Sequence, residues 1–412
     1  MPPRKRIPTK ATAAEVATEA GKFDRKAATL AIRNKLNRKT TSSKYGPGTV
    51  VSASEVVVPT RLPTGSPAFD VAMTGGLPVN QWTEVVGNEN SGKTTFILKS
   101  LAKAQRVDPD FVCLWIASET YDPKLATMCG VDNSRVELVE ENIMEIAFDI
   151  ALEYIDGRGC DMVVIDSYPA LSTQLEDAKT MEEHTMGGAK VLNLFMRKCT
   201  KASKRSLTDP DNDRPFTGVI VNQWREKIGV MHGDPRTTPG GKGKNYWMYA
   251  RLDVKRDEWI TDSSKAKIGQ VIKIVCFKMK GARPQQVGVT DFYFADYGEF
   301  KAGDYDEFKG LVNLGLLFDI IGRRGSGYVD LNGVFYKSSA LLVEALRTDQ
   351  QQRARLEKEL VENSKRGLAP VDIEDEPADV VHLVPAIEEE DVPSARPSKP
   401  RKRTPRTAPV AS

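Results

Sequence analysis

The chain has few of the residues that form metal sites or disulfide frameworks. Its 412 residues include five cysteines and three histidines. The cysteines lie far apart, form no C-x-x-C pair, and are Cys113, Cys129, Cys160, Cys199 and Cys276. This spacing argues against a zinc site or a disulfide framework, and it favours buried, reduced thiols in a reducing compartment.

The sequence also lacks a long hydrophobic run and a large excess of one charge. Its longest apolar stretch, at about 311–321, is interrupted by Asn313 and Asp319 and is too short to span a bilayer. The N-terminal MPPRKRIPTK is basic, but no apolar run follows it as in a secretory signal. Lysine and arginine total 59 against 56 for aspartate and glutamate, so a nucleic-acid-binding surface has to be a local patch. We therefore expect a soluble intracellular protein with no membrane partner.

What is present is typical of a folded globular chain. Hydrophobic residues make up 40% and charged residues 28%, and the length predicts two or three folded units. Short apolar runs, separated by segments with helical periodicity, occur at 82–86, 111–117, 162–166 and 218–222. Strands that alternate with helices predict an α/β fold with a mostly parallel central sheet. Two later runs, at 271–280 and 287–294, would extend the sheet edge as an antiparallel pair.

Composition and pattern divide the chain into five predicted segments. They are a basic flexible N-terminus (1–22), an N-terminal arm (23–58), an α/β core (59–300), a small C-terminal α+β domain (301–365) and a Pro-rich tail (366–412). The tail carries an acidic block followed by a basic one, a composition typical of disordered segments. Its KPRKR run could serve as a localisation signal or a DNA tether, although runs of this kind are more often simply solvated charge.

A phosphate-binding motif lies between the first apolar run and the helical segment after it. GNENSGKT, at 87–94, fits G-x-x-x-x-G-K-[ST]. In such a loop, backbone N–H groups at a helix N-terminus converge on phosphate oxygens. Lys93 adds a positive charge for the β- and γ-phosphates, and Thr94 offers a hydroxyl to Mg²⁺. The candidate nucleotide ligands are Gly87, Asn88, Glu89, Asn90, Ser91, Gly92, Lys93, Thr94 and Thr95.

Two carboxylates follow later strand-like runs, at what would be the same edge of the sheet. Asp166 closes MVVID, where a second-strand carboxylate helps to hold Mg²⁺ through water. Glu119 ends FVCLWIASE and is the candidate general base or water-orienting group. Its alternative is a surface carboxylate that caps a turn. The sequence thus predicts a triphosphate site with Thr94 and Asp166 at the metal and with Lys93 and Glu119 as catalytic groups.

Longer segments of the chain resemble the bacterial RecA recombinases and their phage-encoded relatives. The resemblance starts near Thr60 with TGSPAFDVAMTGGLP, includes GNENSGKTT and VVIDS, and continues through NQWREKIGVMHGDPRTTPGG at 222–241. It then covers ARLDVKR and reaches KMKGARP at 278–284. Many NTPases share the phosphate loop, but the 222–241 segment is far more specific. The resemblance implies a RecA-type P-loop NTPase core and a helix-plus-strand polymerisation arm at 23–58, for which a free basic tail is the alternative.

The resemblance also implies roles for single residues of the nucleotide site. Glu119 matches the glutamate that activates water, and Gln223 matches the residue that reads the γ-phosphate and relays it to the DNA-binding loop after it. Lys278 and Lys280 match two lysines that reach ATP bound to the neighbouring subunit, which would complete the site only in a filament. Without the resemblance, these lysines would be outward-facing residues of an edge strand.

The adenine site departs from the family pattern. The family usually has an aromatic residue three positions after the Asp of its Asp-Pro pair, whereas here Asp122-Pro123 is followed by Leu125. Tyr121 is a neighbour that could stack on adenine instead, so we take Asp122 and Tyr121 as candidate cofactor-binding residues. Asn245 also replaces a lysine that is common in the family.

The resemblance implies two DNA-binding loops, at about 175–187 and 224–241. Cations can neutralise DNA phosphates, apolar side chains can wedge between stacked bases, and glycines let backbone N–H groups approach the strand. Taken singly, Ile228 could instead be a core residue and Arg225 a surface charge. The candidate DNA-binding residues are His184, Met186, Gly187, Arg197, Arg225, Lys227, Ile228, Gly240 and Gly241.

These features predict an ATP- and Mg²⁺-dependent recombinase that forms filaments on single-stranded DNA and exchanges strands with a homologous duplex. We expect it in the cytoplasm of a bacterium or a phage-infected host, at the nucleoid, with single-strand-binding and loader proteins as partners. One alternative is a DNA motor ATPase of the helicase or packaging type on the same core. Another is a DNA-coating or annealing protein that no longer hydrolyses ATP, against which the presence of Glu119, Asp166 and Gln223 argues.

Overall fold

Several parts of the chain are described by the computed structural model: residues 24–37, 50, 52–55, 60–178, 187–208, 215–226, 236–281 and 286–366. The predicted N-terminus, much of the arm and nearly all of the predicted tail lie outside these residues. Four candidate DNA contacts also lie outside them: His184, Met186, Lys227 and Ile228.

An eight-stranded sheet forms the centre of the fold, in the order β12-β11-β10-β3-β7-β6-β4-β5. The strands are β3 (Trp82–Val86), β4 (Cys113–Ala117), β5 (Val136–Val139), β6 (Met162–Asp166), β7 (Thr217–Asn222), β10 (Ala250–Thr261), β11 (Lys267–Met279) and β12 (Gln286–Tyr293). Neighbouring strands from β10 to β5 pair in parallel, whereas β11 and β12 are antiparallel. The predicted α/β fold with a mostly parallel sheet and an antiparallel edge is therefore confirmed.

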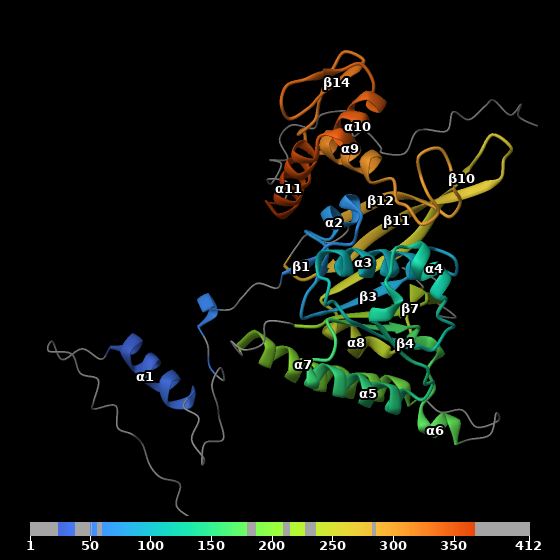
Figure 1. Cartoon of the computed structure of the whole chain (residues 1–412). Helices are drawn as coiled ribbons and strands as arrows, with labels where there is room; N and C mark the ends of the chain where they lie inside the picture. The colour runs from blue at the N-terminus through green and yellow to red at the C-terminus, as the bar shows by residue number, and fades with distance from the viewer. Residues whose placement is uncertain are drawn as a thin grey trace, which may run out of the picture. The chain divides into compact units, whose positions relative to one another are not determined.

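Helices cover both faces of the sheet (Figure 1), α3 and α4 on one side and α5 and α7 on the other. Their bounds are α3 (Lys93–Val107), α4 (Pro123–Met128), α5 (Met144–Gly157) and α7 (Gly188–Thr208). Strand β4 shows why both faces are covered, because its side chains alternate between two apolar clusters. Cys113 and Trp115 belong to the cluster with α3, and Leu114 and Ile116 belong to the cluster with α5 and α7. Its apolar run is thus buried on both faces, as in other parallel sheets.

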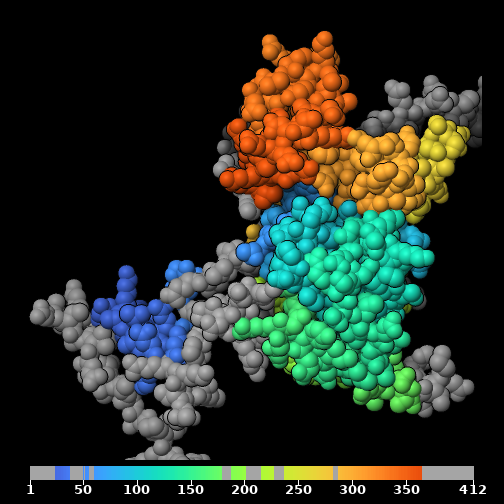
Figure 2. All heavy atoms as spheres, viewed as in Figure 1, coloured from blue at the N-terminus to red at the C-terminus, as the bar shows by residue number. Residues whose placement is uncertain are grey.

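The C-terminal part of the described chain is a small α+β unit. It contains α9 (Glu307–Leu317), β13 (Gly322–Arg324), β14 (Gly327–Val329), β15 (Phe335–Tyr336), α10 (Ser339–Thr348) and α11 (Gln350–Arg366). Its apolar side chains share a cluster with Ala68 and Val71 of α2 (Pro67–Ala72). In Figure 2 the atoms of this unit, orange to red, accordingly lie against those of the core.

Shorter elements complete the described chain. They are α1 (Arg25–Asn37), η2 (Ala53–Glu55), β1 (Arg61–Leu62), β2 (Leu77–Pro78), η3 (Asn133–Arg135), η4 (Tyr168–Ala170), α6 (Gln174–Asp177), β8 (Arg225–Glu226), β9 (Arg236–Thr237) and α8 (Gly241–Trp247). Helix α1 falls in the predicted arm and has no buried residue. No helix in the described ranges combines the length and the apolar character that a membrane span requires.

Candidate nucleotide and DNA site

The phosphate loop leaves the carboxyl end of β3 and leads directly into α3. Gly92, the N-cap residue, has φ of 96° and Asn90 has φ of 54°, both left-handed. A Cβ at Gly87 would lie 2.3 Å from the carbonyl oxygen of Val254, so this position excludes every other residue. The first N–H groups of a helix have no partner within the helix, and this tight turn directs those of α3 into the loop.

Polar side chains of the loop are placed to meet a triphosphate. Lys93 Nζ donates to the carbonyl oxygen of Asn88 at 2.7 Å, so its ammonium lies across the loop. Burial lowers the pKa of Lys93, against the attraction of Asp166 and Glu119. Among the described residues, the buried hydroxyl of Ser91 has no hydrogen-bond partner. The loop therefore offers a cation and an unused hydroxyl to an anionic ligand.

The two predicted metal ligands lie together. Thr94 Oγ1 donates to Asp166 Oδ2 at 3.2 Å, which joins the start of α3 to the end of β6. Both groups offer oxygen, the ligand type that Mg²⁺ prefers. The described residues contain no cluster of three or more His, Cys, Asp or Glu side chains suited to a metal. An ion held here would therefore depend on phosphate oxygens for its other ligands, as Mg²⁺ does at nucleotide sites.

Glu119 lies beside this pair, at the end of β4. Ser167 Oγ donates to Glu119 Oε1, and the N–H of Glu119 donates to the carbonyl oxygen of Asp166 at 3.1 Å. Burial, and then the charge of Glu119, raise the pKa of Asp166 to about 6, against the hydrogen bond from Thr94 and the charge of Lys93. Two carboxylates at a partly buried edge favour a divalent cation there, since it would offset their repulsion.

The predicted adenine contacts are engaged within the chain. Asp122 caps α4, where its Oδ1 accepts from the N–H groups of Lys124 and Leu125 at 2.8 and 3.2 Å. The ring of Tyr121 packs edge-on against Trp115, with centroids 5.3 Å apart, and its hydroxyl donates to Asn133 at 2.8 Å. Tyr121 is thus directed into the core cluster.

Gln223 follows the last residue of β7 at the same edge of the sheet. Asn222 pairs with Val86 in the parallel register, so Gln223 lies level with Gly87, where the phosphate loop begins. The N–H of Gln223 donates to the side chain of Asn222 at 2.9 Å. The structure thus brings Gln223 to the edge that carries the phosphate loop, as the resemblance implies.

Lys278 and Lys280 do not join this edge within one chain. Lys278 pairs with Arg251, level with Glu84 in the middle of β3, whereas the phosphate loop leaves the carboxyl end of that strand. Lys278 Nζ donates to the carbonyl oxygen of Asn245, and Lys280 Nζ donates to that of Tyr246 at 3.2 Å. Both lysines therefore hold the last turn of α8 in their own chain.

The second predicted DNA loop begins and ends on a two-stranded ribbon. Arg225 of β8 pairs with Thr237 of β9, so the ribbon begins two residues after Gln223. Gly240 and Gly241 follow, with φ of 93° and 72°, and open α8. Arg225 is exposed, as a phosphate contact requires.

The described contacts of the first loop flank α7. Gly187 directly precedes this helix, and Arg197 is exposed on it. The upstream part of the loop contains α6, whose N-cap residue Thr173 forms a reciprocal capping box with Glu176. Arg197 is thus carried by α7, which Gly187 precedes and which packs on α5 by a stacked contact of Phe195 with Phe148.

Sequence reasoning did not assign a role to several residues around the second loop. Trp224 Nε1 donates to Asp253 Oδ1 at 2.8 Å, and the guanidinium of Arg236 lies over the Trp224 ring at 4.7 Å. Arg236 also pairs with Asp253 at 3.3 Å. Trp224 and Arg236 therefore fix both ends of the loop to Asp253 of β10.

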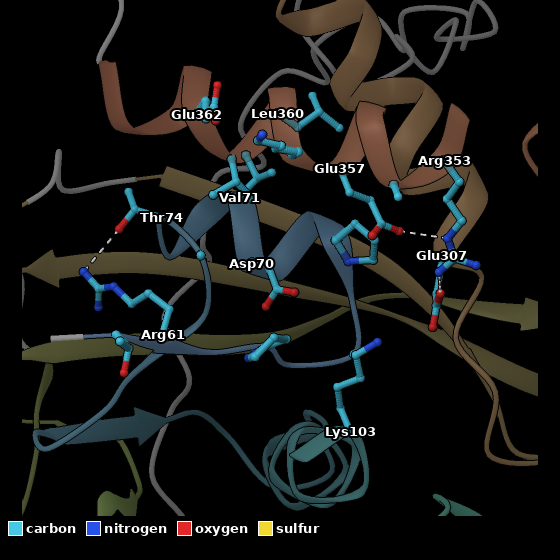
Figure 3. Close-up of a pocket in the computed structure, with 18 of the residues that line it drawn as sticks. Arg61, Asp70, Val71, Thr74, Lys103, Glu307, Arg353, Glu357, Leu360 and Glu362 are labelled. Atoms are coloured by element: carbon cyan, nitrogen blue, oxygen red, sulfur yellow. Dashed lines mark hydrogen bonds and ion pairs between the residues drawn. The ribbon is translucent and has the colours of Figure 1, made fainter. Parts of the chain in front are cut away.

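A separate cavity of about 1050 Å³ lies between α2, α3 and α11 (Figure 3). Its lining includes Arg61, Asp70, Lys103 and Glu357, and none of the candidate site residues. The N–H and the hydroxyl of Thr64 both donate to Asp70 Oδ1, each at 2.8 Å. The cavity thus lies apart from the phosphate loop.

Comparison with known proteins finds one family that matches the part of the chain containing this site. Residues 32–298 match the family model of the RecA N-terminal domain. The chain is 33% identical to Protein RecA of Frankia casuarinae over 289 residues, which cover 69% of this chain and 79% of that protein. It is 32% identical to Protein RecA of Salinispora tropica over 323 residues, covering 77% and 88%. For Protein RecA of Streptomyces ambofaciens the identity is 34% over 269 residues, covering 65% and 68%.

Proposed function

Because this chain belongs to the RecA family of recombinases, we propose that it is an ATP-dependent enzyme that coats single-stranded DNA and exchanges it with a homologous duplex. The observation that carries the proposal is the meeting of Thr94, Asp166, Glu119 and Gln223 at one edge of the sheet. The segment that follows Gln223 is the one most specific to the family. The nucleotide site and the DNA-binding segment would therefore meet at the carboxyl end of β7.

The chain's own groups divide the work of hydrolysis. Residues 87–95 bind the triphosphate, with Lys93 at the β- and γ-phosphates. Thr94 and Asp166 would hold Mg²⁺, which would supply positive charge to the phosphate oxygens. Glu119 orients a water molecule, whose oxygen bonds to the γ-phosphorus as the bond to the ADP oxygen breaks; the proton passes to Glu119 and then to solvent.

The state of the nucleotide would control DNA binding through Gln223. Its side-chain amide hydrogen-bonds the γ-phosphate and finds another partner after phosphate leaves, which moves the segment at 224–241. Arg225 and Lys227 neutralise DNA phosphates, Met186 and Ile228 enter the base stack, and the candidate glycines approach the backbone. His184 and Arg197 add contacts from the first loop and α7. Base pairing between strands, and not the side chains, would read the sequence.

A filament of identical subunits would complete each nucleotide site. Lys278 and Lys280 lie away from their own phosphate loop, which suits a role toward ATP bound by the neighbour. Helix α1 exposes Leu30 by 49% and Ile32 by 60%, and packing on the next subunit would cover them. The proposed domain division places this helix in the arm at 23–58, before the core at 59–300 and the C-terminal domain at 301–365.

The proposed setting is the cytoplasm of a bacterium or a phage-infected host. There the protein would act at the nucleoid in recombination and repair, with single-strand-binding and loader proteins as partners. Asp122 and Tyr121 stay proposed as contacts near the adenine.

Three-strand exchange tests the proposal. Lys93→Ala should remove exchange because it removes the cation that faces the β- and γ-phosphates, and wild-type protein should exchange strands only with ATP. Full exchange by Lys93→Ala would contradict the proposal. Closed rings in place of filaments on single-stranded DNA would favour a motor ATPase.

A further inference from the structure

A cluster of charged side chains lies inside the protein, next to the second predicted DNA loop. Glu84 in β3 and Lys244 in α8 both have fully buried side chains, and Lys244 Nζ lies 2.6 Å from Glu84 Oε1. Arg251 of β10 holds the other carboxylate oxygen through its Nε at 2.5 Å. Asn222 of β7 donates from Nδ2 to Glu84 Oε1 at 2.8 Å. Four elements of the fold thus meet at one carboxylate.

Stability alone does not explain a lysine at this position. Burial lowers the pKa of Lys244, and the Glu84 carboxylate opposes that shift. The three N–H donors of the ammonium have three acceptors: Glu84, the Thr238 hydroxyl at 2.6 Å and the Asn245 side-chain oxygen at 3.1 Å. A buried ion pair of this kind adds little net stability over apolar residues of similar size, whereas removal of one partner leaves the other charge buried with fewer contacts.

The cluster is joined to the nucleotide edge through one residue. Asn222 Oδ1 accepts from the N–H of Gln223 at 2.9 Å, while its Nδ2 also donates to the carbonyl oxygen of Pro239 at 3.1 Å. A displacement of Gln223 therefore changes the orientation of Asn222. That change reaches both the Glu84 carboxylate and the end of the DNA loop.

The same cluster is joined to the predicted subunit-facing lysines through α8. This helix opens at Gly240 and Gly241, where the DNA loop ends. Its last carbonyl oxygens, those of Asn245 and Tyr246, accept from Lys278 and Lys280. Lys244 lies between these two ends, so it anchors the helix that links them.

We propose that Lys244 is a positioning residue that couples the nucleotide site to the DNA loop at 224–241. It does so by joining α8 and Thr238 to the Glu84 carboxylate, to which Asn222 also donates. The inference rests on the proposed function, because it takes Gln223 to respond to the γ-phosphate. Being fully buried, Lys244 contacts neither nucleotide nor DNA and acts through its neighbours. Without it, α8 loses its contact with the Glu84 carboxylate, and the loop end keeps only the bonds of Arg251 to Thr238 and of Asn222 to Pro239. The loop then follows the nucleotide less closely.

The test compares Lys244→Met with Lys242→Met, which removes the same charge from an exposed position of α8. The dissociation constant for a fluorescent oligothymidine is measured by anisotropy, with a slowly hydrolysed ATP analogue and with ADP. The coupling is the ratio of the dissociation constant with ADP to the dissociation constant with the ATP analogue. We expect Lys242→Met to keep the wild-type ratio, and Lys244→Met to reduce it about tenfold, within the usual range of such couplings. The affinity of Lys244→Met for a fluorescent ATP analogue, measured without DNA, should equal that of the wild type. A general loss of structure would lower this affinity.

The outcomes separate the inference from the proposed function. A folded Lys244→Met protein with the wild-type ratio overturns the inference, and so does an equal loss in Lys242→Met. A wild-type protein whose DNA affinity is the same with both nucleotides contradicts the proposed function itself, and the inference falls with it. If Lys244→Met does not fold, Lys244→Gln replaces it, because the glutamine amide can still donate to Glu84. We then expect a ratio between the wild-type value and a tenfold lower one. An unchanged ratio would overturn the inference.

Discussion

Asp70 and Asp166 are both largely shielded from water, yet their neighbours suit them to different tasks. Asp166 lies within reach of a cation and of Thr94, at the edge where a metal would bind. Asp70 faces the cavity of Figure 3, with the N–H and hydroxyl of Thr64 as its donors. Burial raises the pKa of Asp70 to about 7, more than Thr64 and Lys103 lower it. Asp70 therefore gains or loses its proton near neutral pH, whereas a bound cation would keep Asp166 ionised.

The raised pKa of Asp70 predicts a pH dependence of stability. The unfolded chain loses this proton near pH 3.8 and the folded chain near pH 7, so the free energy of unfolding falls as pH rises between these values. Asp70→Asn cannot ionise and should gain stability relative to wild type at pH 8, by about 2 °C in Tm. Thermal unfolding of both proteins at pH 5 and pH 8 measures the effect. The exposed Asp156→Asn is the control, and an Asp70→Asn protein with the wild-type pH profile would refute the prediction.

Glu119→Gln should separate ATP binding from hydrolysis. Glutamine keeps an oxygen to accept from Ser167 but cannot take a proton, so kcat should fall by about 10²- to 10⁴-fold. Binding of ATP and ATP-dependent binding of single-stranded DNA should persist, since neither needs proton transfer. Steady-state hydrolysis and anisotropy on labelled DNA check both halves. Undiminished hydrolysis would remove Glu119 from the catalytic groups.

At the scale of elements, strands with strong local patterns could be predicted from the sequence. The run at 162–166 matches β6, and the run at 218–222 falls within β7, because strands buried on both faces are continuously apolar. Strand β5 could not be found in this way, since at the sheet edge Glu137 and Leu138 are exposed.

The candidate site was predictable where a motif or the end of a strand-like run marks its residues, and it was not predictable where only the tertiary fold pairs them. The phosphate loop carries Lys93 and Thr94 in one motif. The Glu84–Lys244 contact joins residues 160 positions apart by number, and nothing local to either names its partner. The sequence signal for a buried charge here is Glu84 itself, which stands inside the apolar run WTEVV. Pairing of buried charges is set by the tertiary fold, so local pattern cannot supply it.

The packing of β7 on β3 gives a prediction for one glycine. A Cβ at Gly218 would lie 2.3 Å from the Trp82 ring, so Gly218→Ala should destabilise the protein by about 1–3 kcal/mol through overpacking. Gly157, at the end of α5, has no atom within 4 Å of such a Cβ, and Gly157→Ala should be neutral or slightly stabilising. Denaturant unfolding measures both variants. Equal stability of the two would show that the Trp82 ring can move aside.

At the scale of the whole molecule, the proposed site is shared between subunits. Lys278→Ala combined with Lys280→Ala should leave ATP binding by the isolated chain intact, since both lysines lie away from their own phosphate loop. DNA-stimulated hydrolysis should fall at least about tenfold, because each site would lose two cations from its neighbour. Titration with a fluorescent ATP analogue and a hydrolysis assay with single-stranded DNA make the comparison. Unchanged stimulation would place the lysines outside the active site.

The central claim is that the triphosphate decides whether this chain polymerises on single-stranded DNA. Electron microscopy of the full chain on such DNA, with a slowly hydrolysed ATP analogue or with ADP, tests it most directly. We predict continuous helical filaments with the ATP analogue and few or none with ADP. Filaments that form equally with both nucleotides, or no filaments with either, would contradict the account.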